Sequence, residues 1–121
     1  MNYTVESRDA FSLYTIPHED SGNALLSAML AAKNAHESCV FNLKDCAVID
    51  IRIAHAIMEF HQFQYENDLS FALAFASESV SPVIKQADED RQLNMVPTLE
   101  EAIDIISMEG LERELMSGDD F

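Results

Sequence analysis

Imidazole and carboxylate side chains that could bind a metal ion or move protons gather at two places in the sequence. His55, Glu59 and His61 form one group, and residues 18–20, of sequence HED, form the other. At 3.6 residues per turn, His55 and Glu59 share a helix face, whereas His61 lies about 120° around the helix from His55. Neither group has the spacing of a known metal motif, so we expect no bound metal ion.

Serine hydroxyls are present, but nothing in the sequence activates one of them as a nucleophile. The candidates are Ser70, Ser77, Ser79 and Ser81, and none of them lies in a glycine elbow. The chain has only three glycines, and they form no glycine-rich phosphate loop. The sequence therefore predicts neither an enzyme nor a cofactor, and we interpret Ser79 and Ser81 as helix caps.

The stretch AVIDIRIAH carries the remaining candidates, because an apolar run gives way there to helical spacing. Asp50 is well placed as an N-cap. Arg52 puts a positive charge in the first helical turn, where the helix dipole disfavours it by roughly 0.3 kcal/mol. Arg52 either pairs with Asp50 or Glu59 or contacts a partner. Ile51 and Ile53 either form an exposed apolar patch or point into the core.

Hydrophobic periodicity predicts the elements that position these residues. The predicted strands are 3–5, 11–16, 39–45, 69–75 and 93–96, and the predicted helices are 23–36, 51–64, 81–87 and a last one from 98 onward. Asp20 or Ser21 is expected to cap the first helix, and Ser81 the third. Strands that alternate with helices in this way imply a largely parallel sheet.

Length and charge limit the classes of function. With 121 residues the chain suits one domain, which we place at residues 1–116, followed by an acidic tail at residues 117–121. The formal net charge is −15, which argues against nucleic acid or an anionic membrane surface as a partner. Cys39 and Cys46 are expected to be free, buried thiols. No stretch has the pattern of a secretion signal or a membrane span, so we expect a cytoplasmic protein.

The segment VFNLKDCAVIDIRIA, residues 40–54, resembles the STAS domain of anti-anti-sigma factors, which typically reads V-x-D-L-S-x-V-x-F-I-D-S-S-G-L. The matching positions are Val40, Leu43, Ile49 and Asp50. The later segments LSFALAF, SPVI and TLEEA follow in the family's order, so the resemblance covers about residues 39–106. It implies an α/β, STAS-like fold with a four- to five-stranded, mostly parallel mixed sheet and about four helices.

The sequence departs from the family where phosphorylated members carry their serine. That position is Ile51, the next serine is replaced by Arg52, and the following glycine by Ile53; Asn42 stands where an aspartate is common. Isoleucine has no hydroxyl and cannot accept phosphate. A switch that adds about two negative charges at this helix start is therefore absent at residue 51.

The resemblance implies a non-catalytic protein-interaction module of bacterial regulation, of the anti-anti-sigma or partner-switching type but without the serine switch. Its partner would be an anti-sigma kinase-like protein or a signalling complex, bound through Asp50, Ile51, Arg52 and His55. Three alternatives stay open: an accessory subunit of a lipid or anion transport complex, a small-molecule-binding or enzymatic α/β domain that uses the face of His55 and Glu59, and a homodimer through the second helix.

Overall fold

A computed structural model describes residues 3–118 and contains one five-stranded sheet. The strands are β1 (Thr4–Ser7), β2 (Ser12–Thr15), β3 (Cys39–Asn42), β4 (Phe71–Ala74) and β5 (Asn94–Val96). They lie in the order β1-β2-β3-β4-β5, with β1 antiparallel to β2 and every other pair parallel. The predicted mixed, mostly parallel α/β sheet is confirmed.

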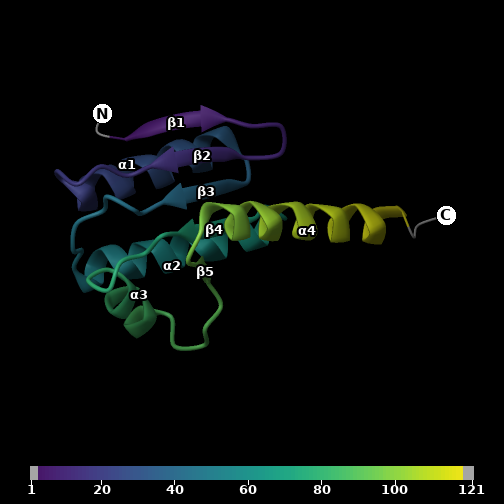
Figure 1. The fold of residues 1–121 in the computed structure, drawn as a ribbon. Coiled ribbons are helices and arrows are strands. Elements are labelled where there is room, and N and C mark those ends of the chain that lie inside the picture. Colours follow the sequence, from purple (N-terminus) through teal and green to yellow (C-terminus); the bar gives the residue numbers. More distant parts are fainter. Residues whose placement is uncertain (1–2, 119–121) are drawn as a thin grey trace.

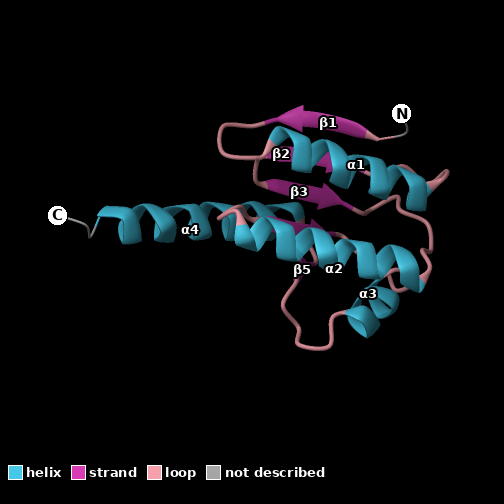
Figure 2. Cartoon of the chain, turned by 180° about the vertical axis from the view of Figure 1, so that it is seen from behind, coloured by secondary structure: helices cyan, strands magenta, loops and turns pink. Residues whose placement is uncertain are grey.

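Four helices cover the two faces of this sheet within the described residues. They are α1 (Ser21–Ala35), α2 (Ile51–Glu66), α3 (Ser81–Ala87) and α4 (Leu99–Gly118). The first three lie on one face and α4 lies on the other, where it crosses in front of the strands in Figure 1 and behind them in Figure 2. None of the described helices is long and apolar enough to cross a membrane.

Alternate residues of the strands fill two separate cores, as a period of two requires. Phe41 of β3 points to the face of α1 and α2, where its ring lies 5.8 Å from that of Phe60. Its neighbour Val40 packs on the other face with Ala72 of β4 and Ile106 of α4. Both faces of the central strands are therefore buried, which explains their nearly unbroken apolar runs.

Hydrogen bonds move several element boundaries away from the predicted ones. The strand predicted at 39–45 ends at Asn42, because the Asn42 side chain accepts a hydrogen bond from the backbone N–H of Lys44 and forms a turn. The hairpin pairing of Ser7 with Ser12 extends β1 beyond the predicted residues 3–5.

The prediction that serines cap α3 is wrong. Ser81 is the first residue of α3, and Val80 holds the N-cap position without a side-chain hydrogen bond. The turn before α3 is held instead by Ser77, whose backbone carbonyl accepts hydrogen bonds from the N–H groups of Val80 and Ser81. Ser79 is exposed in this turn.

The last helix, α4, continues beyond the residues that pack on the sheet. Thr98 caps it, since the Thr98 hydroxyl oxygen accepts a hydrogen bond from the backbone N–H of Glu101. The helix runs through Gly110 without interruption and includes residues 117–118 of the expected tail. The rest of that tail, residues 119–121, lies outside the described residues.

Candidate functional site

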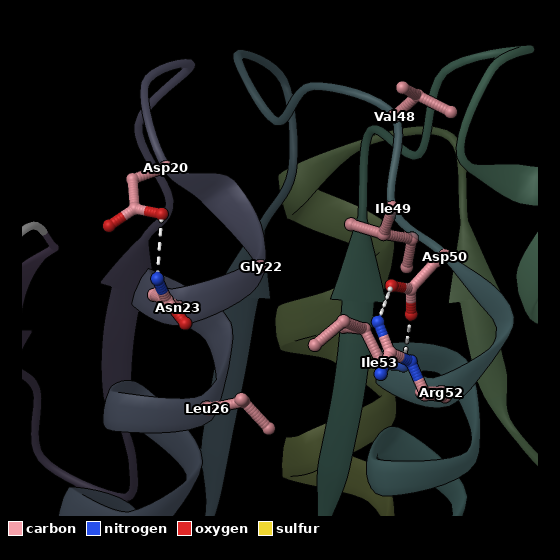
Figure 3. A pocket seen from close by; sticks show the side chains of 9 residues that line it. All are labelled: Asp20, Gly22, Asn23, Leu26, Val48, Ile49, Asp50, Arg52 and Ile53. Carbon is pink, nitrogen blue, oxygen red and sulfur yellow. Dashed lines mark hydrogen bonds and ion pairs between the residues drawn. The ribbon is translucent and has the colours of Figure 1, made fainter.

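The candidate residues lie where the parallel strands end. The loops after β2 and β3 lead into α1 and α2, so the first turns of these two helices stand side by side at the carboxyl end of the sheet (Figures 1 and 3). This end of an open α/β sheet is where such folds generally place their binding sites.

Ser21 ties the two loops together. Its side-chain oxygen accepts a hydrogen bond from the backbone N–H of Ala47 at 2.8 Å and lies 2.6 Å from the carbonyl oxygen of Pro17, to which the hydroxyl donates. Ser21 is buried and belongs to the first turn of α1, so it is not the cap. Asp20 holds the N-cap position in a left-handed conformation, with φ 55°, and its carboxylate accepts from Asn23.

Asp50 caps α2, as predicted. One carboxylate oxygen accepts a hydrogen bond from the backbone N–H of Ile53 at 3.1 Å, and the other lies 3.1 Å from a guanidinium nitrogen of Arg52. The hydrogen bond from Ile53, followed by the contact with Arg52, holds the pKa of Asp50 below its usual range. Of the two ion-pair partners predicted for Arg52, Asp50 and Glu59, the structure shows Asp50. The Arg52 side chain is 88% exposed.

The two helix starts enclose an open groove of about 510 Å³ (Figure 3). Its walls are Asp20, Gly22, Asn23 and Leu26 from the first helix, and Val48, Ile49, Asp50, Arg52 and Ile53 from the second helix and the loop before it. Of the four predicted partner-binding residues, Asp50 and Arg52 line this groove. Ile51 is exposed beside it, and His55 is exposed one turn further along α2.

Ile51 and Ile53 differ in whether their side chains lie at the surface or in the core. Ile51 is 36% exposed, so its side chain is available at the surface. Ile53 is half-buried and packs against the core beneath α1 and α2. Val48, in the loop before them, is 67% exposed and is a second apolar side chain available at the surface near the start of α2.

Sequence reasoning missed the wall that α1 contributes. Leu26 and Asn23 line the groove, yet they lie more than twenty residues before Asp50 in the chain. A usable signal was present, because Leu26 and Leu30 stand beside the buried stripe of α1 rather than in it. Their exposed fractions are 41% and 60%. Apolar side chains that stay exposed and lie next to one another are typical of a binding surface.

The histidine group does not converge. His61 lies in another hollow, at the far end of α2, with Tyr65 and Asn94. Burial lowers the pKa of His61. Among residues 3–118 no three histidine, cysteine, aspartate or glutamate side chains are close enough to hold a metal ion.

Both cysteines are free and buried, as predicted. Cys39 lies in β3, and burial raises the pKa of its thiol well above the ordinary value. Burial also raises the pKa of Cys46, in the loop that Ser21 ties down. Since the thiolate is the reactive form, neither cysteine is poised as a nucleophile.

No protein-family model matches the chain, and no curated protein matches it. Solved structures do. A variant of RsbS from Moorella thermoacetica is 14% identical, with a TM-score of 0.74, over 93% of this chain and 99% of the other. A putative anti-sigma factor antagonist from Thermotoga maritima is 15% identical, with a TM-score of 0.71, over 87% of this chain and 94% of the other.

An anti-sigma-factor antagonist (STAS) domain protein from Planctomyces limnophilus is 15% identical, with a TM-score of 0.61, and the match covers 87% of this chain and 97% of the other. A component of the stressosome, described as a signal integration and transduction hub, matches with a TM-score of 0.64 at 15% identity, over 86% of this chain and 96% of the other. These matches show the fold: the chain folds like the STAS-domain anti-sigma factor antagonists, as the resemblance predicted.

Proposed function

We propose that this chain is a non-catalytic regulatory module that binds a protein partner through the start of α2. The similar structures support this class of function, since they are described as anti-sigma factor antagonists and as part of a signal integration hub. Within the class, we assign this chain to the partner-switching type, with an anti-sigma kinase-like protein as its partner.

One observation carries the proposal. Val48 and Ile51 expose apolar side chains at the start of α2, next to the ion pair of Asp50 and Arg52. Leu26 adds an exposed apolar side chain on the α1 wall of the groove, across from Ile53 in Figure 3. Exposed apolar groups with charged groups at their edge have the composition of a protein interface, whose centre is apolar and whose rim is polar.

The missing hydroxyl at residue 51 makes binding independent of phosphorylation at that position. Phosphate on a residue next to Asp50 would bring added negative charge beside an existing carboxylate. With Ile51 at this position, the surface stays apolar whether or not a kinase is active. We therefore propose a constitutive interaction, or one that is regulated at another place.

Binding to purified anti-sigma kinase-like proteins from the source organism tests the proposal. We expect the wild-type chain to bind one of them, and the double variant Val48→Asp, Ile51→Asp to bind at least about tenfold more weakly, a loss of roughly 1.4 kcal/mol. Val5→Asp is the matched control, because Val5 is 51% exposed on β1, away from the groove. Equal binding by the double variant and the control would show that the surface is wrong.

Incubation with the bound kinase and ATP separates the missing switch from a displaced one. Intact-mass measurement should show no phosphate at residue 51 of the wild-type chain, whereas the Ile51→Ser variant should gain one phosphate. Phosphate on Ser79 or Ser81 of the wild-type chain would instead reveal a switch at the start of α3. A transport protein as the sole partner would favour the role of an accessory transport subunit.

A further inference from the structure

The helix α4 has apolar side chains on two opposite sides. Ile106 is buried against the sheet with Ala102. Met108, Leu111 and Leu115 lie roughly 140–180° around the helix from Ile106, at about 100° per residue. Their exposed fractions are 61%, 58% and 64%. These three residues form one exposed stripe, which we call the α4 stripe.

The second half of α4 extends past the sheet and is nevertheless held in place. In both Figure 1 and Figure 2 it projects beyond the strands toward the C-terminus. Arg113 donates a hydrogen bond to the side-chain oxygen of Ser70 at 2.9 Å, and Asn94 donates one to Glu109 at 3.3 Å. These contacts hold the sheet-facing side of the helix, so the opposite side, with the α4 stripe, is presented outward.

The charges beside the stripe point to the chemistry of what covers it. The sequence of α4 contains six carboxylates and a single basic residue, Arg113. Glu112 directly follows Leu111 and Glu114 directly precedes Leu115, so each is turned about 100° from its neighbour, on opposite sides of the stripe. Both glutamates are exposed. The stripe is therefore an apolar strip between two acidic margins.

A second copy of this chain fits the surface poorly. A symmetric pair brings the same patch of both copies together, so the acidic margins of the two helices would face each other. Like charges set against each other across an interface cost several kcal/mol. An anionic membrane is disfavoured by the same charge.

We propose that the α4 stripe is a docking surface for an amphipathic helix of another protein, one with leucine-type side chains on its apolar face and lysine or arginine along both edges. Its apolar residues pack on Met108, Leu111 and Leu115, and its basic residues pair with Glu112 and Glu114. Helices recognise one another in this way when apolar anchors recur every three or four residues. This surface is distinct from the start of α2.

A synthetic peptide of defined composition tests the proposal with the full chain. The probe is a labelled helical peptide of three heptads with leucine at the a and d positions and lysine at e and g. Fluorescence anisotropy at about 0.15 M salt should show binding to the wild-type chain. The variant Leu111→Gln, Leu115→Gln keeps every charge of the protein, and we expect it to bind at least about tenfold more weakly.

Two controls separate stripe recognition from general attraction to an acidic protein. Leu30→Gln is matched, because Leu30 is a 60% exposed leucine on α1, and this variant should bind like the wild type. A peptide with glutamate in place of lysine should not bind. Circular dichroism confirms that each variant is folded.

Equal affinity of the wild type and the Leu111→Gln, Leu115→Gln variant overturns the proposal, as does the absence of binding to the lysine peptide. Sedimentation equilibrium gives a further test. A wild-type dimer that this double variant converts to a monomer would show that a second copy covers the stripe, which overturns the choice of partner.

Discussion

The two surfaces of this molecule lie at opposite ends of the sheet and are built differently. The start of α2, at the carboxyl end of the parallel strands, is fixed by hydrogen bonds from Ser21 and Asp50. The α4 stripe lies on the outward side of α4, which runs toward and past the other end (Figure 2), and its side chains are largely exposed.

Because of this difference, some side chains contribute mainly to the stability of the fold and others are mainly available for binding. A side chain that satisfies a buried backbone group contributes to folding, because an unpaired buried group costs free energy. An exposed apolar side chain contributes little to folding and is available to a partner. We therefore expect changes near Ser21 to alter the free energy of unfolding, and changes in the α4 stripe to alter binding alone.

The largest change in the free energy of unfolding is expected on the buried side of α4, compared with its exposed side. Ile106→Ala removes a fully buried side chain and should lower the free energy of unfolding by about 2–5 kcal/mol. Leu115→Ala, on the exposed side, should change it by no more than about 0.5 kcal/mol. Urea denaturation measures both. A loss of similar size in the two variants would mean that the stripe is packed rather than exposed.

Ser21→Ala should give the next largest effect. It leaves the backbone N–H of Ala47 without its acceptor and should lower the free energy of unfolding by about 1–3 kcal/mol. Hydrogen exchange at the Ala47 amide should become faster. Ser27→Ala, at an exposed position of the same helix, is the control: it should change the free energy of unfolding by no more than about 0.5 kcal/mol and leave exchange at Ala47 unchanged. An unaffected Ala47 amide would show that Ser21 does not hold the loop.

Acid should weaken the start of α2 through Asp50, with a smaller effect. Because the pKa of Asp50 is lowered in the folded protein, its charged form stabilises the fold above the unfolded pKa. That contribution is lost as the pH falls through the folded pKa. Amide exchange at Ile53 should therefore accelerate at acid pH.

The variant Asp50→Asn should be free of this dependence, since asparagine still caps a helix but does not titrate in this range. An identical acid response in the wild type and this variant would assign the effect to other carboxylates. A carboxyl titration followed by NMR measures the pKa of Asp50 directly.

The smallest effect has the opposite sign. Gly110 lies within α4, and nothing outside its own stretch of helix lies within 4 Å of a Cβ atom built there. Gly110→Ala should therefore raise the free energy of unfolding by roughly 0.5–1 kcal/mol, because alanine has the higher helix propensity. A destabilised variant would show that α4 bends at this residue when the protein is in solution.

Local features were the predictable part of both surfaces. Asp50 stands between an apolar run and a helical pattern, so its role as a cap follows from neighbouring residues, and so does that of Thr98. The periodicity of hydrophobic residues likewise predicted the order of strands and helices. The cap predictions were wrong for Ser21 and Ser81. The Ser21 side chain bonds instead to a loop twenty-six residues away, and Ser81 follows a turn that is closed by hydrogen bonds to Ser77.

The sequence by itself determined the alternating elements, the acidic charge, and the absence of a hydroxyl at Ile51. The tertiary structure decided which apolar residues stay exposed. Leu26 meets the start of α2 only because α1 and α2 pack side by side. Leu111 and Leu115 continue an apolar helix in the sequence, but they face outward because the sheet lies on the other side of α4. A pattern of residues fixes a helix face, whereas only packing decides what covers it.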